Sequence, residues 1–181
     1  HDFGKIGVRE NVLVKAKKLY PDQLERLRAR FDYALAVQRA ELAEAKLESL
    51  RRMGSSGEHA RLDAELERRR CELEQAFELI LSANEPTVLS VAQSEALGEL
   101  TRLTMTDNAG LFVPLVQPEE LESLRVTRGS LTPSELEEIR SHVSHTYRFL
   151  SRIPWGRNLS LVPAIAGCHH ERCNGTGYPQ G

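Results

Sequence analysis

The segment PDQLERLRARFDYALAVQRAELAEAKLESLRR, residues 21–52, has the pattern of a long amphipathic helix. Its apolar residues recur at intervals of three and four positions, which places them on one face of a helix. These residues are Leu24, Leu27, Phe31, Leu35, Leu42, Ala45 and Leu50. The background is rich in Ala, Glu, Arg and Lys, which favour helices, and Pro21 suits the first helical position because its missing N–H has no partner there.

A second segment with the same pattern follows residues 53–57, MGSSG, which interrupt the first helix. Seven charged residues lie between Arg61 and Arg70 in this segment. Its apolar face carries Leu62, Leu66, Leu73, Phe77 and Ile80. Two long helices joined by a short turn predict an antiparallel hairpin that projects from the rest of the chain. A solvated hairpin without chemistry is the simpler interpretation. The alternative is an arm that forms a homodimer through its apolar seam or couples a signal.

The rest of the chain is also mostly helical in pattern. Residues 1–20 are the exception, because two glycines and a β-branched patch predict a loop there. We expect a shorter helix after Pro86, a loop over about 107–118 and a helical turn at 119–124. The predicted fold class is therefore all-α.

Residues 131–143, LTPSELEEIRSHV, contain another helix start. Their Thr-Pro-Ser-Glu run is a capping box with proline at the first helical position, and we expect the helix to reach about Ile153. The same lead-in occurs at 19–31, LYPDQLERLRARF, at a constant offset of 112 positions. His142 in the later copy stands opposite Arg30 in the earlier one, so only the later copy can supply a histidine ligand.

Composition and charge exclude several classes of protein. The 181 residues include 24 Lys and Arg against 26 Asp and Glu, and a net charge of −2 leaves no broad basic surface for DNA or RNA. No apolar run approaches the roughly 18 residues of a membrane span, and no signal peptide opens the chain. Three cysteines are too few and too irregular for a disulfide scaffold. We therefore expect a cytoplasmic protein with no membrane segment.

Histidines and one aspartate carry the potential chemistry of the chain. His1 and Asp2 are adjacent, His169 and His170 form a second adjacent pair, and His142 lies on a helix between them. Imidazole and carboxylate are ligand types that divalent metals accept together. A carboxylate that bridges two ions holds them about 3.5–4 Å apart, the separation used in phosphoester hydrolysis. Taken alone, each pair is more typical of exposed polar residues.

Two of the cysteines offer an alternative interpretation of the second histidine pair. Cys168 and Cys173 flank it, which raises the hypothesis of a zinc knuckle. Structural zinc sites usually bring a second ligand pair at a fixed distance, so this hypothesis is disfavoured. Cys71 lies in a charged helical stretch and is expected to be a packing residue.

Three motifs occur in the order typical of one family. They are HDFGK at 1–5, the helix that bears His142, and HHERCNGTGYPQG at 169–181. Together they resemble the HD-GYP family, a branch of the HD metal-dependent phosphohydrolases.

The resemblance covers residues 1–31 and 125–181, and residues 32–124 look like an insertion. It implies an HD-type helical bundle core that is interrupted by the long antiparallel helical hairpin. It also implies hydrolysis of a cyclic dinucleotide, typically cyclic di-GMP, with two or three divalent metal ions that are iron or manganese. Diguanylate cyclase (GGDEF) domains are implied as partners that bind the GYP loop.

The same resemblance assigns roles to individual residues. The metal ligands would be His1, Asp2, His142, His169 and His170. Asp2 would bridge two ions and help to activate a water molecule. Lys5 would contact the scissile phosphate and stabilise the charge that develops on it.

Further residues near these motifs are expected to support the site. Glu171 is expected to orient a ligand histidine. His145, one helical turn beyond His142, could face the same site. The loop would shape the mouth of the site through Gly175, Gly177, Tyr178 and Pro179.

The sequence departs from the family pattern in two respects. Arg172, Cys173 and Asn174 stand where the family has an aromatic or apolar residue and then Asp. The family also draws ligands from a helix before its HD pair and from a carboxylate after its GYP loop, and we find neither here. Two alternatives therefore stay open: a catalytically weak regulatory or interaction module, and an HD phosphohydrolase that acts on another nucleotide.

Overall fold

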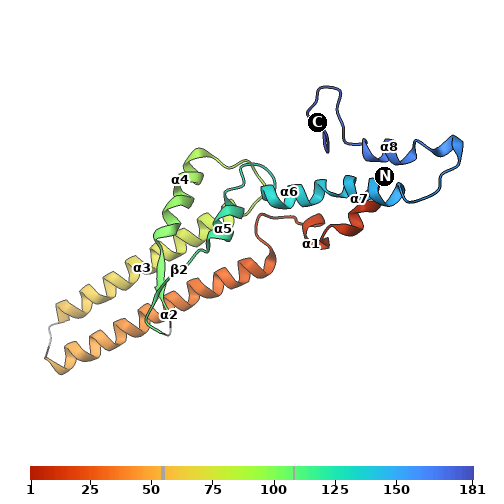
Figure 1. Cartoon of the computed structure of the whole chain (residues 1–181). Helices are drawn as coiled ribbons and strands as arrows, with labels where there is room; N and C mark the ends of the chain where they lie inside the picture. The colour runs from red at the N-terminus through yellow and green to blue at the C-terminus, as the bar shows by residue number, and fades with distance from the viewer. Residues whose placement is uncertain (54–55, 108) are drawn as a thin grey trace. The chain divides into compact units, whose positions relative to one another are not determined.

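A computed structural model describes residues 1–53, 56–107 and 109–181 of the chain. These residues form helices and one short two-stranded sheet (Figure 1), which confirms the predicted all-α class. No helix within these three ranges is both long enough and apolar enough to cross a membrane.

The described chain divides into two compact units. Residues 1–16 and 131–181 form one, which we call the motif unit, and residues 17–130 form the other, which we call the hairpin unit. The division predicted from the family resemblance differs, since it also assigns residues 17–31 and 125–130 to the core, and it stays a prediction.

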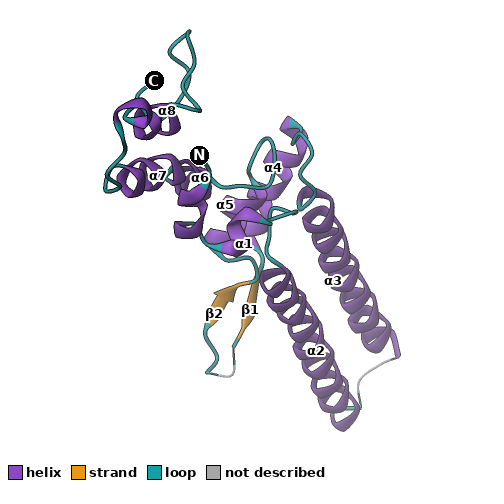
Figure 2. Cartoon of the chain, turned by 90° about the vertical axis from the view of Figure 1, so that its right-hand side faces the viewer, coloured by secondary structure: helices purple, strands orange, loops and turns teal. Residues whose placement is uncertain are grey.

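Two long helices form the frame of the hairpin unit. They are α2 (Pro21–Arg51) and α3 (Ser56–Ala83), which run antiparallel and side by side (Figures 1 and 2). The turn between them is predicted at 53–57, of which Gly54 and Ser55 lie outside the described residues. The predicted helical hairpin is confirmed.

An apolar core joins these helices to three shorter elements, α4 (Val91–Glu99), η2 (Leu100–Arg102) and α5 (Pro118–Leu124). Its most deeply buried members include Leu27, Ile80, Leu97, Leu115 and Leu124. Complete burial of one such side chain stabilises a fold by about 1.5–3 kcal/mol. Apolar packing, rather than the charges on the helix surfaces, therefore stabilises this unit.

Two strands correct the prediction of a loop over 107–118. They are β1 (Thr104–Thr106) and β2 (Phe112–Pro114), which pair antiparallel with Met105 opposite Val113 (Figure 2). The Asp107 carboxylate provides a reason, since its Oδ1 accepts the backbone N–H groups of Ala109 (2.8 Å) and Leu111 (2.9 Å). An aspartate that binds nearby backbone in this way favours a tight turn.

The first residues of the motif unit are also more ordered than predicted. The expected loop over 1–20 contains η1 (Phe3–Gly7) and the short helix α1 (Glu10–Leu13). One of its glycines allows close packing rather than a bend. Gly4 lies against α7 (His142–Leu150), where an added Cβ atom would stand 1.9 Å from the carbonyl oxygen of His142.

The single helix predicted to run to about Ile153 is instead two helices. The first, α6, spans Pro133–Arg140, and α7 follows after Ser141. The hydroxyl of Ser141 donates to the carbonyl oxygen of Glu138 (2.7 Å), and such local bonds compete with regular helical bonding. The break places His142 at the first position of α7.

A buried ion pair joins the points where the chain leaves the motif unit and returns to it. Lys15 Nζ lies 2.7 Å from Oε2 of Glu135, and the two side chains are only 1% and 9% exposed. Glu135 also accepts the backbone N–H of Thr132 (2.8 Å), as the predicted capping box requires. The unit is completed by η3 (Arg157–Leu159) and α8 (Val162–Gly167).

Candidate metal centre

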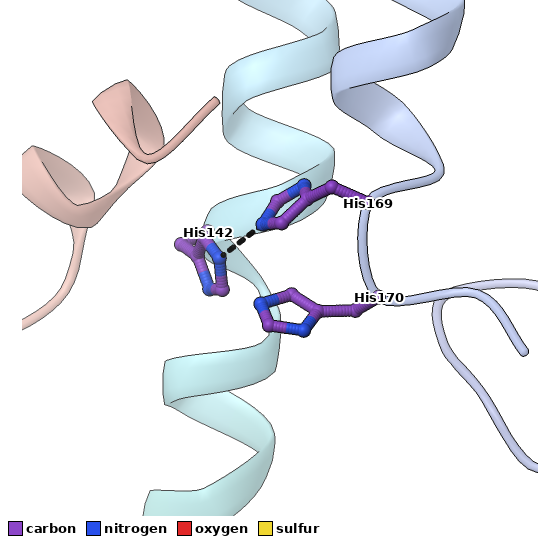
Figure 3. Close-up of side chains that lie close together, drawn as sticks. All are labelled: His142, His169 and His170. Atoms are coloured by element: carbon purple, nitrogen blue, oxygen red, sulfur yellow. Dashed lines mark hydrogen bonds between the residues drawn. The ribbon is translucent and has the colours of Figure 1, made fainter.

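Three histidine side chains converge in the motif unit. His142 comes from the start of α7, and His169 and His170 follow one residue after the end of α8 (Figure 3). The Nε2 atoms of His142 and His169 lie 3.3 Å apart. Because α7 and α8 pack against each other, two segments that are far apart in sequence bring their imidazoles together.

Backbone carbonyl groups orient two of these rings. His142 Nδ1 lies 2.5 Å from the carbonyl oxygen of Ile139, and His169 Nδ1 lies 2.6 Å from that of Ala166. A carbonyl oxygen can only accept, so each Nδ1 is the donor, and in the neutral form of the ring this leaves the lone pair on Nε2. This is the arrangement typical of metal-binding histidines.

The donor set is suitable for a divalent ion. When both rings are neutral, their Nε2 lone pairs face each other at 3.3 Å and repel unless a proton or a metal ion lies between the two nitrogens. Metal–nitrogen bonds of about 2.0–2.1 Å bring neighbouring ligands of one ion to about this separation. His142 is only 1% exposed, so water does not solvate its ring freely.

Asp2 brings a carboxylate to the same nitrogens. Its Oδ1 lies 3.5 Å from Nε2 of His142 and 3.9 Å from Nε2 of His169. Its Oδ2 lies 3.0 Å from Lys5 Nζ and 3.5 Å from Nε2 of His1. The hydrogen bond from Lys5 lowers the pKa of the Asp2 carboxyl below its ordinary value, which favours the charged form that binds metals.

The described residues thus contain two groups of potential ligands that share His169. One comprises His142, His169 and His170, and the other comprises His1, Asp2 and His169, with the ligand atoms of each group within 4.8 Å of one another. Burial lowers the pKa of His170, and the charges of His169 and His142 act in the same direction. A neutral ring is the form that a metal ion requires.

A threonine that the sequence analysis missed holds residues 1–5, the HD segment, against α7. The Thr146 hydroxyl accepts the backbone N–H of Gly4 (2.8 Å) and donates to the carbonyl oxygen of His1 (2.9 Å). Thr146 is fully buried and stands four positions after His142, hence on the same face of the helix. That spacing is the one signal in the sequence that could have identified it.

Two further candidates have contacts of their own, and their expected roles stay predictions. Both carboxylate oxygens of Glu171 accept backbone N–H groups of the loop, from Gln180 (2.7 Å) and Gly181 (3.2 Å), so this side chain shapes the loop. His145 lies beside Gly7, where an added Cβ would be 2.6 Å from its Nδ1. That Nδ1 is buried without a hydrogen-bond partner, and His145 belongs to neither ligand group.

The loop residues and the cysteines can also be placed. The loop with Gly175, Gly177, Tyr178 and Pro179 folds back so that the Tyr178 N–H donates to the carbonyl oxygen of His170 (3.3 Å). Cys168 and Cys173 are exposed free thiols and belong to neither of the ligand groups found in the described ranges. The zinc-knuckle hypothesis therefore gains no support.

Comparisons with known proteins agree with the motifs. The model of the HD domain family matches residues 65–181, a span that contains His142, His169 and His170 but not His1 and Asp2. A cyclic di-GMP phosphodiesterase of Thermotoga maritima is 45% identical over 53 residues, which cover 29% of this chain and 14% of that protein. No solved structure matches the chain.

The short similarity to that phosphodiesterase and the family match together confirm the HD-GYP resemblance found in the sequence. The family match extends over more than half of the chain. The chain therefore belongs to the HD domain family.

Proposed function

We propose that this chain is part of a metal-dependent phosphodiesterase of the HD-GYP type that hydrolyses cyclic di-GMP. The observation that carries the proposal is the convergence of His142, His169 and His170 with the adjacent pair of His1 and Asp2. The name of the Thermotoga maritima relative supports the choice of substrate. Because the match spans a small part of that relative, the activity of the whole protein is our inference.

The residues that would hold the metal ions are His1, Asp2, His142, His169 and His170. Two or three ions of iron or manganese are the cofactors that the HD-GYP resemblance implies. When bound, such ions lower the pKa of a coordinated water and offset the negative charge of phosphoryl oxygens.

The geometry of Asp2 supports its proposed bridging role. One carboxylate oxygen faces His142 and His169, and the other faces His1 and Lys5. A carboxylate whose two oxygens point to different nitrogen ligands is suited to binding two ions at once.

Lys5 is suited to binding a phosphate oxygen of the substrate. Its ammonium group lies at the Asp2 carboxylate, and its side chain is 44% exposed. A substrate can therefore reach it from solvent. A fixed positive charge at this place stabilises the negative charge that develops on the phosphoryl oxygens as the ester bond breaks.

One observation favours a second candidate, a regulatory HD-GYP module that binds nucleotide or a partner without turnover. Asn174 stands where the family has Asp, and its side-chain oxygen accepts both the backbone N–H (3.2 Å) and the hydroxyl (2.7 Å) of Thr176. The side chain of Asn174 therefore binds another residue of the same loop. GGDEF domains at this loop and a second copy at the hairpin remain the predicted partners of either candidate, and an HD phosphohydrolase for another nucleotide remains the third.

Turnover of cyclic di-GMP by the complete protein with Mn²⁺ or Fe²⁺ tests the proposal. We expect Asp2→Ala to lower the rate by more than about 100-fold. Removing a group that only hydrogen-bonds to a metal ligand already costs about 10–100-fold, and Asp2 is a proposed ligand itself. Asp22→Ala, on the exposed surface of α2, is the matched control and should leave the rate unchanged. Undiminished turnover in Asp2→Ala would overturn the mechanism. Stoichiometric metal without turnover would favour the regulatory module, and turnover of a different nucleotide would favour the third candidate.

A further inference from the structure

His170 differs from the other two converging histidines in how its ring is held. His142 and His169 each donate from Nδ1 to a backbone carbonyl. Within the described part of the chain, neither ring nitrogen of His170 has a hydrogen-bond partner, although the residue is half-buried. Contacts between rings therefore hold this imidazole, which lies against His169 (centroids 4.1 Å apart), His142 (5.3 Å) and Tyr178.

Of these three neighbours, Tyr178 is the one whose ring is stacked on that of His170. The rings of Tyr178 and His170 are stacked, with centroids 4.6 Å apart and planes inclined by 17°. The backbone N–H of Tyr178 also donates to the carbonyl oxygen of His170 (3.3 Å). Ring and backbone of Tyr178 thus bind the same residue.

A cation lies over the same tyrosine. The guanidinium carbon of Arg140, the last residue of α6, is 5.4 Å from the centroid of the Tyr178 ring. A guanidinium over an aromatic face is an attractive arrangement. Arg140 is two positions before His142, so the junction of α6 and α7, which supplies one ligand, also contacts the ring that stacks on another.

The loop is folded in a way that delivers Tyr178 to this place. The Glu171 carboxylate accepts the N–H groups of Gln180 and Gly181 and so ties the end of the loop to its beginning. Gly177 lies so close to the chain that an added Cβ would be 2.5 Å from the backbone nitrogen of Arg172. The loop is therefore held back against the residues that follow His170.

We propose that Tyr178, with Arg140 over its ring, is the positioning residue for His170 and holds the imidazole plane in the orientation that metal binding requires. The inference rests on the proposed metal centre and adds to it a role for the loop in assembling the ligands. It assigns that role to the stacked face of the ring. In the described residues the Tyr178 hydroxyl makes no hydrogen bond, so the hydroxyl is not needed.

Titration of the complete metal-free protein with Co²⁺, followed by the visible absorption of the bound ion, tests this role without any nucleotide. Tyr178→Phe keeps the stack and should bind Co²⁺ within about twofold of wild type. Tyr178→Leu removes the stack and should weaken binding about tenfold and alter the spectrum, as loss of a partner that orients a ligand does. Phe112→Leu, the same kind of exchange at an exposed position of the hairpin unit, should change neither.

The outcomes separate this role from the proposed function. Wild-type affinity and an unaltered spectrum in Tyr178→Leu would overturn the inference, and so would an equal loss in Tyr178→Phe and Tyr178→Leu. Should circular dichroism show that Tyr178→Leu is unfolded, Arg140→Met decides in its place. We expect it to weaken Co²⁺ binding about threefold, and unchanged affinity would then reject the role. Wild-type protein that binds Co²⁺ but hydrolyses no cyclic di-GMP would reject the proposed substrate and leave this inference standing.

Discussion

The motif unit and the hairpin unit use ionisable side chains in opposite ways. On α3, Arg68 and Arg70 pair with glutamates three and four positions away, and all of these side chains are well exposed. Such pairs contribute little to stability because water screens them. In the motif unit, His142 is fully buried and the Lys15–Glu135 pair is almost so. The difference teaches that burial and orientation, rather than the number of charges, distinguish a candidate site from a solvated helix.

The largest expected effect comes from removing a buried ligand. His142→Ala should lower both the bound metal and the rate of phosphodiester hydrolysis by more than about 100-fold, because it removes one of the two facing Nε2 atoms. Metal analysis and a turnover assay measure these changes. The matched histidine in the hairpin unit is His59, whose Nε2 is also buried but unpartnered. If His59→Ala reduced the metal content as much as His142→Ala does, the comparison between the units would fail.

A cavity in the hairpin core should affect stability and leave metal affinity intact. Ile80 is completely buried in the core of this unit, so Ile80→Ala should lower the free energy of unfolding by about 2–5 kcal/mol. Denaturant unfolding and a Co²⁺ titration of the same variant provide the two measurements. A large loss of Co²⁺ affinity in folded Ile80→Ala would show that the units are not independent in this respect.

A methyl group added in the motif unit, by contrast, should weaken metal binding as well as lower stability. Gly4→Ala places a Cβ 1.9 Å from the carbonyl oxygen of His142, a backbone atom that cannot move away cheaply. We expect a loss of about 1–3 kcal/mol in stability, as overpacking usually costs, together with weaker metal binding. Gly156→Ala is the control, since no atom lies within 4 Å of its added Cβ. Equal behaviour of the two variants in thermal unfolding and metal titration would contradict the close packing of η1 on α7.

The smallest expected effect concerns acid sensitivity. Hydrogen bonds from the Arg9 side chain and then from its backbone N–H lower the pKa of Glu138 to about 2. A depressed carboxyl pKa contributes stability that is present above the ordinary value of 4.5 and is lost as the pH falls from there towards about 2. Wild type and Glu138→Gln should therefore differ in thermal midpoint at pH 6 and converge as the pH approaches 2.

Glu65 on α3 is the matched carboxylate for this measurement. Its pKa is lowered by a hydrogen bond from Arg68, three positions along the same helix. Arg9 and Glu138, by contrast, join segments that are far apart in sequence. We expect the change in midpoint for Glu65→Gln to be the smaller one. A larger change at Glu65 would reverse the comparison.

Much of the helical architecture could be predicted from local signals. Proline at the first helical position and apolar residues at helical spacing located the beginning of α2, and the Thr132 capping box located that of α6. The strands β1 and β2 could not be predicted in this way, because three residues are too few to show an alternating pattern. The bonds of the Asp107 side chain to the backbone between the two strands are visible only in the folded chain.

The sequence predicted only those residues of the candidate site whose side chains are themselves of a type that binds metal. Adjacent His and Asp residues in three ordered motifs identified the side chains that converge in the structure. Residues that act through backbone contacts carry no such signal. Thr146 binds two backbone groups of the HD segment, and Glu171 binds two of the loop. Only the folded chain reveals these partners.

The ion pair between Lys15 and Glu135 has a consequence for how the chain can vary. It ties together the two ends of the long segment that forms the hairpin unit, within the motif unit itself. The entropy lost on closing a loop rises only with the logarithm of its length, and each doubling costs about 0.6 kcal/mol. Because its two ends are held together, the segment that forms the hairpin unit can become longer or shorter at little cost in free energy. The number of residues between the HD pair and His142 can therefore vary. The distance of a few ångströms between their side chains cannot.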